Sequence, residues 1–131
     1  MPYIYYNSNP HGNHVIDCTV RAISLFTDKT WDETYLGICM QGFYDKNMPS
    51  ADAVWGAYLE HLGYEPHFVP NKCPNCITVK QFAEDHPEGR YLLAVGQHVV
   101  TVIDGNYYDT FDSGIERPLY YYTKQEETDE L

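Results

Sequence analysis

The sequence contains few basic residues. Lys and Arg together number 8, against 19 Asp and Glu, which gives a formal net charge of −11. A surface of this sign repels phosphate backbones and anionic lipids instead of neutralising them. We therefore expect neither a nucleic acid nor a membrane surface as a partner.

Long apolar runs are also missing. No stretch approaches the roughly 20 apolar residues that a membrane-spanning helix needs. Residues 1–7 lack the basic region followed by an apolar stretch that is typical of a secretion signal. We expect no membrane span and a cytoplasmic location.

Cysteine is too sparse for a disulfide framework, and without a secretory context we expect reduced thiols. The four cysteines are Cys18, Cys39, Cys73 and Cys76. The CxxC formed by Cys73 and Cys76 supplies only two of the four ligands of a closed zinc site, and it does not open a helix after a strand as a thioredoxin-type motif does. We expect a structural turn there, one that could oxidise under stress, and neither a metal nor another cofactor.

The composition is that of a globular domain. The chain is 44% hydrophobic and 21% charged, which supports a buried core and argues against disorder. Its 131 residues suit one domain. We expect a single domain over residues 1–123 and a solvated tail over residues 124–131, which hold one Lys and four acids.

Local signals divide the chain into helices followed by strands. After a loop over residues 1–16, helices are expected at residues 18–28, 31–41, 51–62 and 79–85, with caps at Asp17, Thr30 and Ser50. Strands are expected at residues 66–69, 91–95, 98–103 and 106–111, with an edge strand at 119–123. This order predicts an α+β fold, with the N-terminal helices packed on one face of a C-terminal antiparallel sheet.

Polar residues form a narrow stripe on the first expected helix. Asp17, Arg21, Ser24 and Asp28 fall at helical offsets, and most of the remaining surface is apolar. We expect this helix to be largely buried. On the second helix we expect Trp31, Tyr35 and either Ile38 or Cys39 to face the core.

Cys18 occupies the first position of that first helix, where the helix dipole and the free N–H groups lower the pKa of a thiol. Arg21, one turn further on, offsets the negative charge of Asp17. The position therefore suits a nucleophile. The alternative is a small buried hydrophobic residue.

His98 begins an apolar strand, where a polar ring is costly to bury unless both nitrogens have partners. The position suits a general base, and the alternative is a structural histidine. The remaining histidines are assigned no role: His11, His14, His61, His67 and His86.

The Asp104-Gly105 pair is a strong signal for a two-residue hairpin. Such a turn pairs Ile103 with Asn106 and makes Asp109 the diagonal neighbour of His98, within reach of its ring. A three-residue loop would instead place Asp112 opposite His98. We favour Asp109 as the acid that orients the ring, expect it to be partly exposed, and keep Asp112 as the alternate.

Three segments together resemble a known family. Residues 17–24 (DCTVRAIS), 96–105 (GQHVVTVIDG) and 108–113 (YDTFDS) resemble papain-like cysteine peptidases in the broad sense, including cell-wall endopeptidases whose nucleophile follows an Asp. More narrowly, they resemble small papain-fold proteins common in phages and prophages. The resemblance implies a papain-like fold with Cys18 as nucleophile, His98 as base and Asp109 as orienting residue, hydrolysing a protein or peptide substrate as a cysteine peptidase or amidase.

One position departs from the papain pattern. Papain has a Gln six residues before its nucleophile that donates to the oxyanion, whereas this chain has Gly12. Asn13, or else Asn9, is the candidate to replace it, together with the backbone N–H of Cys18. The alternative function is a catalytically inactive papain-fold protein that acts as a protein-binding module, using its acidic, tyrosine-rich surface to bind a basic or proline-containing protein.

Overall fold

A computed structural model describes residues 2–13, 17–70 and 76–125. Within them lie four helices: α1 (Cys18–Thr27), α2 (Trp31–Asp45), α3 (Asp52–His61) and α4 (Val79–Asp85). The strands are β1 (Tyr3–Tyr5), β2 (Tyr64–Phe68), β3 (Arg90–Val95), β4 (His98–Ile103), β5 (Asn106–Asp109) and β6 (Tyr120–Lys124). They form one six-stranded sheet in the order β1-β5-β4-β3-β6-β2. The α+β class predicted from the sequence is confirmed.

Side-chain caps set two of the helix starts. Thr30 and Glu33 form a capping box at the start of α2, and Thr78 and Gln81 form another at α4. α2 continues four residues past the predicted end because the first residue to leave the helical conformation is Lys46, at φ 55°. α3 begins one residue later than predicted, with Ala51 in the capping position that was assigned to Ser50. Among the described residues, no helix combines the length and apolar character needed to cross a bilayer.

The inner face of α2 is narrower than predicted. Thr34, Ile38 and Gly42 are its buried residues, while Tyr35 is 47% exposed. Tyr35 stacks on Trp31 with ring centroids 5.0 Å apart, so it covers the indole from outside and does not enter the core.

The centre of the sheet is a meander of β3, β4 and β5. Asp104 and Gly105 both have positive φ, 49° and 86°, as a two-residue hairpin turn of the primed type requires. Ile103 pairs with Asn106, so the predicted register is confirmed. The preceding hairpin pairs Val95 with His98 and places His98 at the start of β4.

The sheet is mixed, not purely antiparallel, because residues predicted as loop form β1, which pairs with β5 in parallel. A second correction concerns β6, which lies between β3 and β2 and is not an edge strand. Lys124, predicted to begin the tail, pairs with Tyr64, and the Gln125 N–H donates to the Gly63 carbonyl at 2.8 Å. The ordered domain therefore extends to at least residue 125, and the rest of the predicted tail lies outside the described residues.

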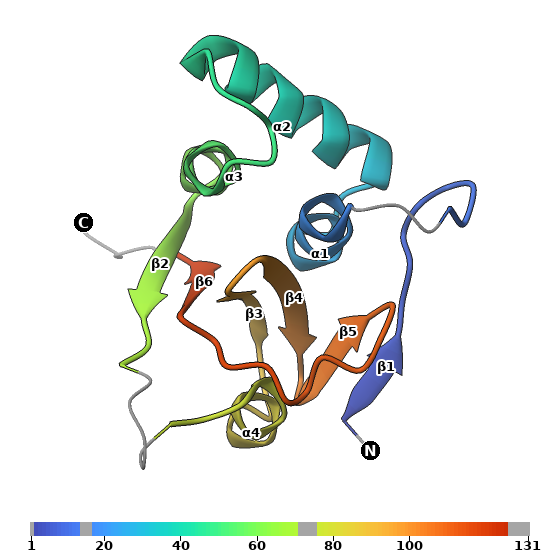
Figure 1. The fold of residues 1–131 in the computed structure, drawn as a ribbon, viewed down its shortest axis with the longest axis vertical. Helices are drawn as coiled ribbons and strands as arrows, with labels where there is room; N and C mark the ends of the chain where they lie inside the picture. The colour runs from blue at the N-terminus through green and yellow to red at the C-terminus, as the bar shows by residue number, and fades with distance from the viewer. Residues whose placement is uncertain (1, 14–16, 71–75, 126–131) are drawn as a thin grey trace, which may run out of the picture.

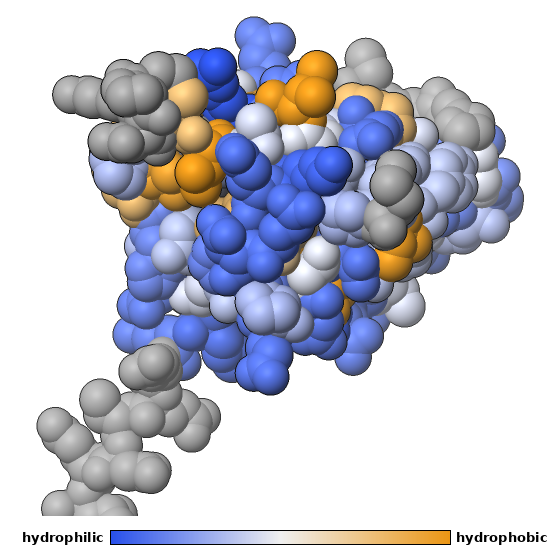
Figure 2. Space-filling model, turned by 90° about the horizontal axis from the view of Figure 1, so that it is seen from below, coloured by the Kyte–Doolittle hydropathy of each residue, from blue (hydrophilic) through white to orange (hydrophobic). Residues whose placement is uncertain are grey.

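Helices cover both faces of the sheet, contrary to the one-sided packing predicted. α1 and α3 lie on one face with α2 outside them, and α4 lies on the other (Figure 1). The first face buries Leu92 and Ala94, and the second buries Leu93 and Val95 against Phe82 of α4. Figure 2 shows the α4 side, whose outer surface is largely hydrophilic. Both faces of β3 and β4 are therefore removed from water, as in strands with continuous apolar runs.

Candidate active site

Cys18 and His98 meet where the start of α1 packs against the start of β4. The two side chains face one cavity and are close enough for each to shift the pKa of the other, and the Val99 backbone N–H and the Thr19 side chain also act on the thiol. Both side chains are partly buried and line one cavity of about 210 Å³. The thiol is therefore reachable from a space large enough for part of a substrate.

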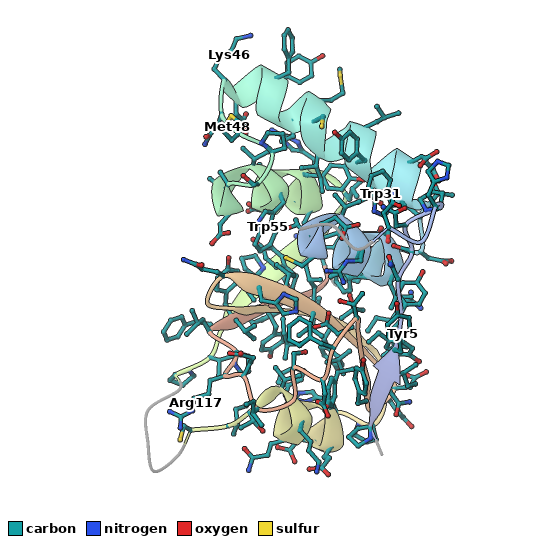
Figure 3. All side chains as sticks on the ribbon, turned by 45° about the vertical axis from the view of Figure 1, so that its right-hand side comes forward. Tyr5, Trp31, Lys46, Met48, Trp55 and Arg117 are labelled. Carbon is teal, nitrogen blue, oxygen red and sulfur yellow. The ribbon has the colours of Figure 1, made fainter. Side chains whose placement is uncertain are left out.

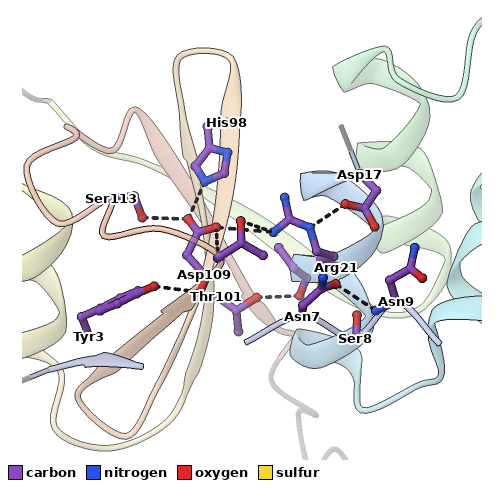
Figure 4. Close-up of polar contacts among 12 residues, drawn as sticks. Tyr3, Asn7, Ser8, Asn9, Asp17, Arg21, His98, Thr101, Asp109 and Ser113 are labelled. Atoms are coloured by element: carbon purple, nitrogen blue, oxygen red, sulfur yellow. Dashed lines mark hydrogen bonds and ion pairs between the residues drawn. The ribbon is translucent and has the colours of Figure 1, made fainter. Parts of the chain in front are cut away.

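Asp109 holds the other side of the His98 ring. Its Oδ2 lies 2.5 Å from His98 Nε2 (Figure 4). Because Nε2 is engaged there, Nδ1 is the nitrogen left to face Cys18. Asp112, the alternate acid, accepts instead from the Tyr107 hydroxyl and from the Gly114 N–H. The two-residue register thus brings Asp109, and not Asp112, to the ring.

The carboxylate of Asp109 is buried, with 3% of the residue exposed, and not partly exposed as predicted. Its Oδ2 also accepts from the Ser113 hydroxyl at 2.8 Å, and its Oδ1 accepts from the Thr110 N–H at 2.8 Å. Arg21 Nη1 lies 3.5 Å from the same Oδ1. With these donors on both oxygens, the carboxylate has one fixed orientation toward His98.

Arg21 connects this acid to the residue before the nucleophile. Its Nε donates to Asp17 Oδ1 at 2.6 Å, and its Nη1 donates to the Thr110 hydroxyl at 3.1 Å. The other oxygen of Asp17 accepts from the Trp31 indole N–H at 2.9 Å. Asp17 stands at the capping position of α1, but its carboxylate does not cap the helix. Of the polar stripe predicted on this helix, Asp17, Arg21 and Ser24 are buried and Asp28 is exposed; Asp17 and Arg21 form the frame of the site.

The first-turn N–H groups of α1 are therefore not capped by the Asp17 carboxylate. Such N–H groups carry the partial positive charge of the helix terminus and bind anions readily. Cys18 is the first residue of this turn, so a carbonyl carbon bonded to its sulfur would hold its oxygen near these donors.

The surroundings of Cys18 and His98 favour the charged forms of both side chains, a thiolate and an imidazolium. Burial by itself would raise the pKa of the Cys18 thiol, but the hydrogen bond and charge of His98, joined by the Val99 N–H, outweigh burial and lower it. Burial would likewise lower the pKa of His98, but the hydrogen bonds to Asp109 and Cys18 raise it to about 9. Both shifts favour the charged forms, a thiolate beside an imidazolium.

The structure does not bring Asn13 to the thiol. Asn13 is exposed, its carbonyl accepts from the Asn7 amide, and its N–H points to the Asn9 side chain. Asn9 is buried, and its side-chain Oδ1 also accepts from the His11 N–H. Neither is among the described residues that line a cavity with Cys18. Both side chains belong to the turn before α1.

Gln97 is a donor that the sequence analysis overlooked. It lies in the turn before His98, is exposed, and lines the cavity that contains the thiol. Its amide can donate to a substrate carbonyl. Its position next to His98 in the sequence was the available signal. Ser113 gave no comparable signal, because it sits in a loop without periodicity.

The remaining cysteines stand apart from this site. Cys39 is free and lines a second cavity of about 190 Å³, mostly apolar, which borders the first at Thr19 and Ser50. Cys76 is disulfide-bonded, which corrects the expectation of reduced thiols, and Cys73 lies outside the described residues. Over the described ranges, no cluster of three or more His, Cys, Asp or Glu side chains could hold a metal ion.

The fold and the site define an α+β domain with a Cys–His–Asp arrangement of side chains. Comparison with protein-family models, with curated proteins and with solved structures found no match. What the chain does is therefore inferred from its own side chains.

Proposed function

We propose that the protein is a papain-like cysteine hydrolase, a peptidase or amidase that works by acyl transfer through Cys18, His98 and Asp109. One observation carries the proposal: the His98 ring is hydrogen-bonded to a buried carboxylate and lines the same cavity as the Cys18 thiol, whose pKa it lowers. A thiolate made nucleophilic by an adjacent base, which is itself oriented by a third group, is the arrangement of covalent catalysis.

In the first half-reaction, the Cys18 thiolate attacks the carbonyl carbon of the scissile amide. The electron pair moves to the oxygen, which the first-turn N–H groups of α1 stabilise. As the tetrahedral species collapses, the C–N bond breaks and His98 gives its Nδ1 proton to the leaving amine. A thioester on Cys18 and a neutral imidazole remain.

In the second half-reaction, neutral His98 takes a proton from water as the water oxygen attacks the thioester carbon. Collapse of this species releases the carboxylic acid and restores the thiolate and the imidazolium. Asp109 keeps Nε2 protonated throughout, so that Nδ1 always faces the sulfur.

A second candidate, a catalytically inactive protein-binding module, is favoured by the outer side of α2. Large apolar side chains there are more than half exposed: Leu36, Met40, Phe43, Tyr44 and, just beyond the helix, Met48. Such a surface is typical of a contact with another protein. Most of these residues belong to α2, the helix that lies outside α1 and α3 (Figure 1).

A simple ester separates the two candidates. With 4-nitrophenyl acetate, we expect a burst of nitrophenolate and an acetyl group on the Cys18 peptide by mass spectrometry. Cys18→Ala should lose both, while Cys39→Ala, which removes the other free thiol, should keep both. Background turnover with no acetyl-Cys18 would count against the enzyme and in favour of the binding module.

A further inference from the structure

The cavity that contains the thiol also contains a carboxylate that the mechanism does not use. Asp52, the first residue of α3, lines the space together with Cys18, His98 and Gln97. In the reactive ion pair, the Cys18 thiolate and the His98 imidazolium cancel each other in charge. None of the described residues that line this cavity is Lys or Arg. Asp52 therefore gives the cavity a net negative charge.

Asp52 is held in place from the core side. The indole N–H of Trp55 donates to its Oδ1 at 3.2 Å. Trp55 is 1% exposed, lies between α3 and the sheet, and stacks on the Tyr120 ring with an interplanar angle of 10° (Figure 3). A buried ring held in this way gives the exposed carboxylate above it a defined orientation.

One oxygen of Asp52 remains available. Within the part of the chain that the structure describes, Oδ2 of Asp52 has no hydrogen bond and no ion pair. Asp17, which lines the neighbouring cavity, differs because Arg21 and Trp31 engage both of its oxygens. Of these two acids beside the nucleophile, Asp52 is the one with an oxygen left for a ligand.

We propose that Asp52 determines substrate specificity, and that the amide or peptide substrate carries a cationic group, an ammonium or guanidinium, which binds this carboxylate. The inference rests on the proposed function. A cavity of about 210 Å³ has the volume of about seven waters at about 30 Å³ each, enough for one long side chain. A cation there pairs with Asp52 while the adjacent carbonyl reaches Cys18.

Two pairs of substrates that differ only in charge test this proposal. The first pair places the charge on the acyl part: the 4-nitrophenyl esters of N-acetyl-lysine and of N-acetyl-norleucine. The second places it on the leaving part: acetylthiocholine and its neutral isostere, S-(3,3-dimethylbutyl) thioacetate. We expect the cationic member of at least one pair to have a kcat/KM about tenfold higher, as a single partly exposed ion pair would give.

Two variants test whether Asp52 causes the preference for the cationic substrate. Asp52→Asn retains an oxygen for the Trp55 indole and should bring the ratio of kcat/KM within the selective pair close to one. Glu60→Gln, near the other end of α3, removes an exposed carboxylate that does not line this cavity and should retain the ratio. Circular dichroism checks that both variants fold.

The outcomes separate this inference from the proposed function. Equal kcat/KM within both pairs, or a preference that survives in Asp52→Asn, would overturn the role of Asp52 while Cys18-dependent turnover still stands. If Cys18→Ala turns over the neutral ester as fast as the unmodified protein does, the hydrolase proposal fails, and the specificity proposal fails with it.

Discussion

At the scale of single residues, the two free thiols of the described chain differ in reactivity. Cys18 has a lowered pKa and an imidazolium beside it, whereas Cys39 borders an apolar cavity. We expect iodoacetamide to label Cys18 at least about tenfold faster than Cys39 near pH 7, because the thiolate is the reacting form. Timed labelling followed by peptide mass spectrometry measures both rates in one sample. Equal rates would contradict a thiolate at position 18.

A second prediction compares Asp109, which ends β5, with Asp112 in the loop that follows. Asp109→Asn keeps the size of the side chain but loses the charge that favours the imidazolium, so activity should fall about 10²-fold or more. Asp112→Asn removes a charge that contacts Tyr107 and Gly114 and not His98, so activity should change by less than about threefold. Initial rates with the activated ester, at matched protein concentration, test both. A larger loss in Asp112→Asn would reassign the acid.

At the scale of elements, α1 carries both the nucleophile and the arginine that supports the acid. Arg21 is 8% exposed and is surrounded by the carboxylates of Asp17 and Asp109. Arg21→Met would leave two buried carboxylates without their cation and should lower the free energy of unfolding by about 3–5 kcal/mol. Arg21→Lys keeps the charge but loses the planar fork, so its free energy of unfolding should lie between those of the unmodified protein and of Arg21→Met. Urea unfolding followed by tryptophan fluorescence measures the three proteins. Equal free energies of unfolding for Arg21→Met and the unmodified protein would show that the ion pairs of Arg21 do not stabilise the fold.

Several elements could be predicted from the sequence because their signals are local. The Thr30–Glu33 and Thr78–Gln81 capping boxes and the Asp104-Gly105 turn are each set by a few neighbouring residues. The hairpin register then brought Asp109 to His98. β1 was missed because three residues are too few to show a period, and its partner is at the other end of the sequence.

The position of α4 on the second face of the sheet was not predicted from local sequence patterns. β3 and β4 are continuous apolar runs, which indicate burial on both faces and therefore a covering layer on each. The predicted fold nevertheless placed helices on one face only, whereas α4 covers the other. The contact of Arg21 with Asp109 was also missed, because it joins a helix to a strand end 88 residues later. Charge patterns within one helix reveal only the pair with Asp17.

At the scale of the whole molecule, pH dependence follows from the coupled pair. Hydrolysis requires the thiolate and the imidazolium together, so kcat/KM should rise as the Cys18 thiol ionises and fall as His98 deprotonates near its pKa of about 9. Asp109→Asn should shift the alkaline limb to lower pH, because the hydrogen bond to Asp109 raises the pKa of His98. Rates measured from pH 5 to 10 in constant ionic strength test this. An unmoved alkaline limb would assign it to another group.

The same titration affects stability, with a defined sign. The folded-state pKa of His98 lies above its unfolded value of about 6.5. Its contribution to stability is therefore fully present below about pH 6.5 and is lost as the pH rises through about 9. The lowered pKa of Cys18 acts in the opposite direction: its contribution is present above the unfolded thiol pKa and is lost as the pH falls through the folded value.

The pairing of β1 with β5 bears on when the site forms. Tyr3 donates through its hydroxyl to the Asp109 carbonyl across 106 residues of sequence, and the Tyr6 N–H donates to the same carbonyl at 2.9 Å. During synthesis, the segment with Cys18 leaves the ribosome long before the strands that carry His98 and Asp109. Until β4 packs against α1, the thiol has no base, and until β5 docks beside β1, the Asp109 backbone lacks the Tyr3 and Tyr6 donors that hold it. The nascent chain is thus protected from its own nucleophile until strands from the last third of the sequence have packed against the helix near its start.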